Sequence, residues 1–165
     1  MKVLDQAFGE NWALYQGDNT EVVRGIQDNS IGLTVYSPGF ENLYVFSDSE
    51  RDMSNNISAG FFEQYRFLAA ELLRVTMPGR LCAVHCMQIP SMKYRDGFIG
   101  IRDFRGDLIR AHQASGWIYH AEVCIWRDPV TQMQRTKAIG LLYKQVRKDS
   151  TMSRMGLPDY LLVFR

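Results

Sequence analysis

The sequence lacks any long hydrophobic run. No apolar stretch reaches the roughly 18 residues that a helix needs to cross a bilayer. The first residues carry Asp5 and Glu10, where a secretory signal peptide would be apolar. We therefore expect a cytoplasmic protein with no membrane partner.

Cysteine is scarce, and neither sign of charge dominates. Three cysteines in 165 residues, an odd number without framework spacing, argue against a disulfide scaffold and favour a reducing compartment. Nineteen basic and eighteen acidic residues give a net charge of +1. Any binding to nucleic acid must therefore come from a local basic patch and not from a global field.

The motifs of several enzyme classes are missing. The sequence contains no Gly-x-Ser-x-Gly elbow of a serine hydrolase. It contains no G-x-G-x-x-G or Walker loop that would cradle a cofactor phosphate. His120-Ala121-Glu122 matches the first half of the zinc deaminase signature, but no Pro-Cys-x-x-Cys follows it. These absences argue against all three classes.

A zinc site is not expected either, although residue types that bind zinc occur in two segments. These residues are Cys82, His85, Cys86, His120 and Cys124. Cys82 and Cys86 lie four residues apart on a predicted strand, which separates them by about 13 Å, too far to share an ion. We expect no metal, and we expect these cysteines to be ordinary core residues.

What is present is the pattern of one α/β domain over residues 1–165. The hydrophobic fraction of 46% is that of a globular protein, and the length suits a single core. The predicted strands cover residues 13–16, 31–36, 80–87, 117–126 and 159–164, the predicted helices 20–26, 58–75, 104–115 and 131–146, and the polar loops 41–58 and 90–103. This alternation predicts a doubly wound three-layer sandwich around a largely parallel sheet.

The helix over residues 58–75 has the clearest periodicity. Ser58 is placed to cap this helix at its start, and Pro78-Gly79 is placed to stop it. Thr20 is placed to cap the shorter helix over residues 20–26. Apolar residues recur along it at three- and four-residue spacing. These residues are Phe61, Phe62, Tyr65, Leu68, Ala69, Leu72, Leu73 and Val75.

A candidate site follows the strand over residues 31–36. The tetrapeptide Ser37-Pro38-Gly39-Phe40 comes at its carboxyl end, where open α/β sheets bind their ligands. A hydroxyl, a free carbonyl and an aromatic ring can accept hydrogen bonds from an amino group and stack on its ring. The alternative interpretation is a Pro-Gly turn whose aromatic ring folds back into the core.

One basic cluster lies near the end of the chain. Its members are Arg135, Lys137, Lys144, Arg147, Lys148 and Arg154, against one acid, Asp149. Such side chains make the phosphate contacts of nucleic-acid binding, but they also fill ordinary solvated helix faces. A second, weaker group of cations is Lys93, Arg95, Arg102 and Arg105.

Several motifs in order resemble the amino-group DNA methyltransferases, and most closely the circularly permuted group of bacteriophages and restriction-modification systems. They are Tyr15-Gln16-Gly17-Asp18, Asp28-Asn29-Ser30, Ser37-Pro38-Gly39-Phe40, Glu71-Leu72-Leu73-Arg74-Val75 and Pro78-Gly79-Arg80. The resemblance implies a Rossmann-like sheet and the transfer of a methyl group from S-adenosylmethionine to adenine N6 or cytosine N4 of double-stranded DNA. It also implies a location in a bacterial or phage-infected cell.

The resemblance also implies roles for individual residues. Ser37 and the carbonyl of Pro38 would accept hydrogen bonds from the target amino group, while Phe40 stacks on a base flipped out of the duplex. Asp18 would contact the cofactor. The basic cluster would contact DNA.

The sequence departs from the family pattern in two places. Gly39 stands where the family has a second proline, and glycine makes the turn less stiff. The glycine-rich cofactor loop is absent, and in permuted members it lies beyond the position of Arg165. We therefore expect a partial sheet that lacks its cofactor-binding strands. The open edge beside residues 31–36 should bind a second copy or a separate cofactor-binding chain. The alternative function is a catalytically silent module of the same fold that binds DNA or protein.

Overall fold

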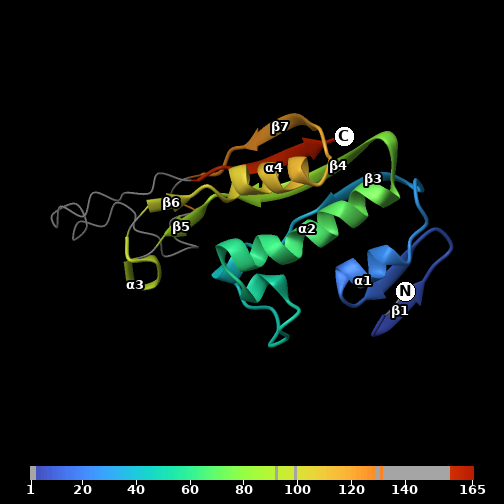
Figure 1. The fold of residues 1–165 in the computed structure, drawn as a ribbon, viewed down its shortest axis with the longest axis horizontal. Coiled ribbons are helices and arrows are strands. Elements are labelled where there is room, and N and C mark those ends of the chain that lie inside the picture. The colour runs from blue at the N-terminus through green and yellow to red at the C-terminus, as the bar shows by residue number, and fades with distance from the viewer. Residues whose placement is uncertain (1–2, 92, 99, 129–130, 132–156) are drawn as a thin grey trace.

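The computed structural model describes residues 3–91, 93–98, 100–128, 131 and 157–165 (Figure 1). Eight strands and four α-helices make up the described part of the chain, together with two short 3-10 helices. In chain order they are β1 (Asp5–Phe8), β2 (Ala13–Gln16), α1 (Asn19–Arg24), β3 (Ile31–Tyr36), η1 (Glu41–Leu43), η2 (Met53–Asn55), α2 (Ser58–Val75), β4 (Thr76–Met87), β5 (Ile89–Ser91), α3 (Lys93–Asp96), β6 (Gly100–Arg102), α4 (Phe104–Ala114), β7 (Tyr119–Ile125) and β8 (Asp159–Phe164).

The central sheet has four strands in the order β3-β4-β8-β7. β3 pairs with β4 in parallel, whereas β8 pairs antiparallel with both β4 and β7. Three strands therefore point the same way, and β8 runs against them. The α/β class is confirmed, and the sheet is mixed, because β8 runs antiparallel between β4 and β7 while the other three strands share one direction.

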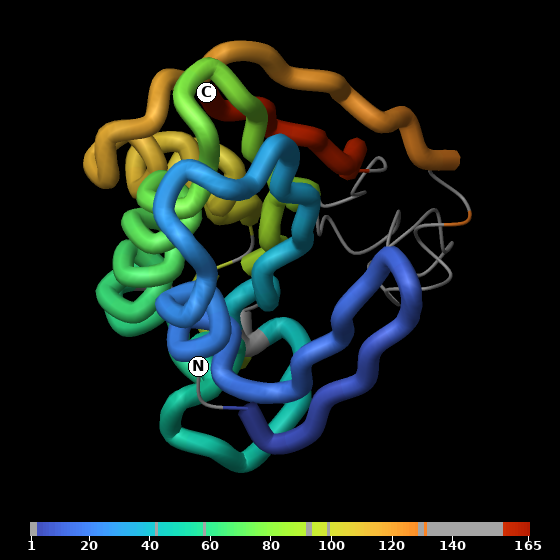
Figure 2. The backbone as a smooth tube through the Cα atoms, turned by 90° about the vertical axis from the view of Figure 1, so that its right-hand side faces the viewer, coloured from blue at the N-terminus to red at the C-terminus, as the bar shows by residue number. Residues whose placement is uncertain are grey.

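Helices α2 and α4 cover one face of this sheet, as Figure 2 shows. The periodicity of α2 is confirmed, because residues such as Phe61, Tyr65 and Leu68 are buried against Val84 and Leu162 of the sheet. Trp117 follows α4, and its indole N–H donates to the carbonyl of Ala69 in α2 at 3.0 Å. Burial of such side chains supplies most of the stability of an amphipathic helix.

The opposite face of the sheet carries exposed apolar side chains. On β3 they are Leu33, 59% exposed, and Val35, 65% exposed. On β7 they are Val123 and Ile125. The expected third layer is therefore not found among the described residues. The prediction that β3 is a buried strand is wrong, because one of its faces is open and, in the described sheet, it lies at the edge.

Near the N-terminus, two predictions need correction. The strand over 13–16 is present as β2, but it pairs with β1, which the sequence pattern did not indicate, to form a hairpin. The helix after it is capped by Asp18 and not by Thr20, because the Asp18 carboxylate accepts hydrogen bonds from the backbone N–H groups of Thr20 and Glu21. It also ends at Arg24, two residues earlier than predicted.

The join between α2 and β4 also differs from the prediction. The helix ends at Val75 because Thr76 turns into extended backbone while its hydroxyl donates to the carbonyl of Leu72 at 2.7 Å. Pro78-Gly79, predicted to stop the helix, instead lies inside β4, where the pairing with β3 shifts between the Ile31–Thr76 and Leu33–Leu81 partners. Gly79 has a φ of 77°, which glycine adopts readily.

The predicted loop over residues 90–103 contains short ordered elements. β5 and β6 pair antiparallel, with α3 between them. The helix predicted over 104–115 and the strands predicted over 117–126 and 159–164 are confirmed as α4, β7 and β8. The helix predicted over 131–146 lies almost wholly outside the described residues. No helix in the described part of the chain is long and apolar enough to span a membrane.

Candidate functional site

The tip of β3 places the predicted tetrapeptide at the carboxyl end of the sheet. Side chains alternate along a strand, so Tyr36 points to the helical side and Ser37 to the opposite side. The Tyr36 hydroxyl lies 2.6 Å from that of Tyr65 and 3.3 Å from Nε2 of His112. Ser37 is exposed and Pro38 is buried. The partly buried tyrosine thus fixes the strand immediately before the exposed serine.

Ser37, which directly follows β3, begins a row of three hydrogen-bonded side chains, and the other two lie on β4 and β8. Its Oγ lies 3.3 Å from Nδ1 of His85 on β4 and 3.2 Å from the His85 carbonyl oxygen. On the other side of the imidazole, Nε2 lies 2.8 Å from the carboxylate of Asp159, the first residue of β8. A serine, a histidine and an aspartate are therefore brought together although the sequence has no nucleophile-elbow motif.

Asp159 is the buried end of this row. Its side chain is 2% exposed, whereas that of His85 is 33% exposed. The same carboxylate oxygen that meets His85 also pairs with Arg127, which follows β7. The other oxygen, Oδ1, has no hydrogen-bond partner among the described residues.

Phe40 packs partly inward and partly faces the site. Its ring contacts Phe104 edge-on, with centroids 6.0 Å apart, and lies 6.4 Å from the ring of His85. The side chain is partly buried against the core cluster. Phe40 is therefore neither fully folded into the core nor free, and the structure contains elements of both interpretations of the tetrapeptide.

Gly39 has a packing reason to be glycine. A Cβ atom at this position would lie 2.6 Å from Cβ of Ser54. Ser54 is buried, and its backbone N–H donates to Asp52 at 3.0 Å. The turn is thus held against the η2 segment, and a second proline at this position would collide with it.

A buried ion pair lies directly after the tetrapeptide. Glu41, 3% exposed, pairs with Arg102 of β6. Arg95 pairs with Asp96, and Arg105 pairs with Glu122 at 2.6 Å and lies over the ring of Tyr160. The weaker group of cations is therefore engaged largely in internal pairs, and it is not a free basic patch in the described structure.

Asp18 lines a cleft of about 590 Å³ between the N-terminal segment and the loop after β3. One carboxylate oxygen caps α1, and the other lies 3.8 Å from Arg51. Met53 lines the same cleft and is adjacent to Ser54, the residue that packs against Gly39. The η2 segment therefore touches both the Asp18 cleft and the tetrapeptide.

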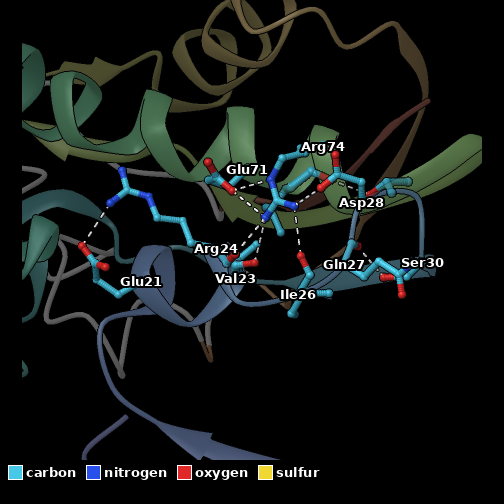
Figure 3. Close-up of polar contacts among 11 residues, drawn as sticks. Glu21, Val23, Arg24, Ile26, Gln27, Asp28, Ser30, Glu71 and Arg74 are labelled. Atoms are coloured by element: carbon cyan, nitrogen blue, oxygen red, sulfur yellow. Dashed lines mark hydrogen bonds and ion pairs between the residues drawn. The ribbon is translucent and has the colours of Figure 1, made fainter. Parts of the chain in front are cut away.

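The other motif residues have a structural role, shown in Figure 3. Arg74 of α2 pairs with Glu71 and Asp28. Its guanidinium also donates to the carbonyls of Ile26 and Val23, at 2.9 and 3.1 Å. These contacts fix the turn between α1 and β3 to the end of α2, so they set the position at which β3 begins.

The predicted DNA-binding residues lie outside the described part of the chain. They are Arg135, Lys137, Lys144, Arg147, Lys148 and Arg154. Cys82 and Cys86, in contrast, are buried in the core as expected, and burial raises the pKa of each thiol to about 12.

Sequence reasoning missed the roles of His85 and Asp159. The sequence suggests His85 only as a zinc ligand and Asp159 only as the start of a strand. The alternation along residues 82–86 does place His85 on the face opposite the two cysteines. No local signal, however, indicates that residues 48 and 74 positions apart meet.

Comparison of the structure with known proteins finds, among others, three structures of two proteins. TTHA0409 of Thermus thermophilus, named as a DNA modification methylase, matches 90% of this chain with a TM-score of 0.61 and 14% identity. The same protein complexed with S-adenosyl-L-methionine matches with a TM-score of 0.62 and 13% identity. The cytosine-N4-specific PvuII DNA methyltransferase matches 90% of the chain with a TM-score of 0.59 and 16% identity. The chain shares the methyltransferase fold of these structures.

The likeness establishes this methyltransferase fold and is partial. The chain spans about half the length of these structures, 51%, 53% and 46% in turn. No family model and no curated protein sequence matches the chain. The partial coverage agrees with a methyltransferase sheet that is represented here by part of its strands.

Proposed function

We propose that the chain acts in methyl transfer from S-adenosylmethionine to an exocyclic amino group, cytosine N4 or adenine N6, of a base flipped out of double-stranded DNA. The observation that carries the proposal is the exposed Ser37 hydroxyl at the tip of β3, beside the partly exposed ring of Phe40 and within reach of His85. We further propose a protein of the circularly permuted type, working in the cytoplasm of a bacterium or a phage-infected cell.

The residues of the site supply positioning and polarisation. The Ser37 hydroxyl and the Pro38 carbonyl accept hydrogen bonds from the amino group, which directs its nitrogen lone pair toward the methyl donor. The open side of Phe40 stacks on the extruded base. No covalent bond to the protein is required in this reaction.

The Asp18 cleft fits a cofactor of this kind. Its volume of about 590 Å³ lies within the usual range of small-molecule sites. The Asp18 oxygen that faces Arg51 can accept a hydrogen bond from a hydroxyl or amino group of the cofactor. S-adenosylmethionine, when bound, supplies an electrophilic methyl group on a sulfonium.

We propose that β3 pairs with a strand of another polypeptide, either a chain that carries the cofactor-binding elements or a second copy of this chain. The support is its edge position in the described sheet and the two exposed apolar residues that it presents. The coverage of about half of each structural neighbour agrees with a missing complement.

Cofactor binding tests the proposal first. Calorimetric titration of the 165-residue chain with S-adenosylmethionine should give a site in the micromolar range, and Asp18→Asn should weaken it. Transfer of a labelled methyl group to duplex DNA should be lost in Ser37→Ala, whereas Ser115→Ala, at the end of α4 and outside the Asp18 cleft, should retain it. Absence of both cofactor binding and transfer would favour the silent module.

A further inference from the structure

We infer that His85 and Asp159 receive, through the Ser37 hydroxyl, the proton that the target amino group must release. This inference rests on the proposed function and assigns to that site a proton acceptor. It concerns two residues that neither the tetrapeptide nor the other motifs include.

The hydrogen-bond roles follow from the acceptor at the buried end. Asp159 as a carboxylate can only accept, so His85 Nε2 carries a proton and donates it across the 2.8 Å contact. Nδ1 of the neutral ring then holds a lone pair that faces the Ser37 Oγ at 3.3 Å. With its own hydrogen directed at the ring or at the His85 carbonyl, Ser37 presents oxygen lone pairs outward.

The three hydrogen-bonded side chains of Ser37, His85 and Asp159 run from the surface to the interior. Ser37 is exposed, His85 is one-third exposed and Asp159 is 2% exposed. A carboxylate that is buried, with one oxygen unpartnered among the described residues, costs free energy. The ion pair with Arg127 compensates part of this cost, and the same carboxylate oxygen is in place to stabilise an imidazolium at His85.

A purely structural role would need only part of this arrangement. The pair of Asp159 with Arg127 already ties β8 to the segment after β7, and regular pairing joins β8 to β4. These contacts hold the strands without His85. A purely structural contact between the strands would not require His85 to reach the exposed Ser37 at the tip of β3.

The chemical step balances as follows. The amino nitrogen forms a bond to the methyl carbon, the bond from that carbon to the sulfonium sulfur breaks, and its electron pair stays on the sulfur. The nitrogen, now carrying one proton too many, gives it to Ser37 Oγ as the Ser37 proton passes to His85 Nδ1. The products are the methylated amine, a neutral thioether and an imidazolium hydrogen-bonded to Asp159.

Nuclear magnetic resonance of the ring nitrogens tests the coupling apart from activity. The protein has three histidines, so the ring-nitrogen signals of His85 are assigned by their loss in the variant His85→Gln. In the described structure, the charged group that contacts the His85 ring is Asp159, and Arg127 contacts the same Asp159 carboxylate. The wild-type ring should carry its proton on Nε2, which faces Asp159, and Asp159→Leu should lower the share of this tautomer. An unchanged tautomer in a folded variant would overturn the inference.

Single-turnover methyl transfer to duplex DNA completes the test. His85→Gln should slow transfer by about 100-fold or more with an unchanged Kd for DNA, a split between rate and affinity that general loss of structure would not give. His120→Gln, on the exposed part of β7, is the matched control and should keep the rate. Transfer that persists in His85→Gln overturns this inference alone, whereas a wild-type chain that transfers no methyl group overturns the proposed function.

Discussion

At the scale of single residues, Gly39 shows how a departure from a family motif can be a local fit. The Cβ of an alanine would meet Ser54, which is buried and tied to Asp52. We expect Gly39→Ala to lower the free energy of unfolding by about 1–3 kcal/mol through overpacking. Chemical denaturation should show that adding Ser54→Gly recovers part of this loss. Strictly additive effects would mean that the two residues do not compete for the same space.

His112 makes stability depend on pH. It is buried, donates from Nδ1 to the Leu108 carbonyl at 2.8 Å and stacks on Phe164. Burial lowers its pKa from the ordinary 6.5 to about 4, although the hydrogen bond to Leu108 opposes this. The unfolded chain therefore takes up a proton first as the pH falls. The free energy of unfolding should drop by about 3 kcal/mol between pH 6.5 and 4 and level off below.

Denaturant unfolding measured at several pH values checks this. The variant His112→Asn, which cannot titrate and can still donate to the Leu108 carbonyl, should lose most of the decline between neutral and acid pH. His120→Gln should retain it. The same slope in His112→Asn and in the wild type would assign the pH dependence to other groups.

At the scale of elements, Arg74 joins α2 to the turn before β3. Its fork of donors meets two carboxylates and backbone carbonyls at once, an arrangement that one ammonium group cannot reproduce. We expect Arg74→Lys to lower Tm by several degrees, in contrast to Arg66→Lys on the exposed part of the same helix. Equal Tm values for the two variants would show that the turn holds without the guanidinium.

The basic cluster is predicted to act through phosphate contacts. Reversal of charge at Arg147 and Lys148 to glutamate should weaken duplex binding and reduce the slope of log affinity against log salt concentration by about 2. The double reversal of Arg66 and Arg110, on α2 and α4, is the control. An unchanged slope in the first variant would make the cluster an ordinary solvated surface.

The success of sequence reasoning differed between elements and site. The helix over 58–75 was predictable because its signal is local, a repeat of apolar residues that the core then buries. The tip of β3 was predictable because it immediately follows a strand. The contact of Ser37 with His85 and Asp159 was not, since it depends on β8 inserting beside β4, a pairing between distant parts of the chain. Neither was the role of Gly39, which depends on the position of Ser54.

At the scale of the whole molecule, the open edge and face of the sheet should govern association. Leu33 and Val35 expose apolar surface on β3, the edge strand of the described sheet, so the chain should exceed its monomer mass in light scattering at tens of micromolar if copies pair. Val35→Lys should restore the monomer, since lysine on an edge strand opposes pairing. A monodisperse wild-type monomer would exclude the second copy and leave the separate cofactor-binding chain as the partner.

The two hydroxyl groups at the end of β3 face opposite sides of the sheet. Tyr36 reaches inward to Tyr65 and His112, and Ser37 faces outward to His85. Inserting or deleting one residue within this strand would exchange the sides that Tyr36 and Ser37 face. The interior would lose the tyrosine contacts, and the site would lose the serine hydroxyl. Natural length variation among descendants of this gene should therefore spare the strand and accumulate after Phe40, where the chain leaves the sheet.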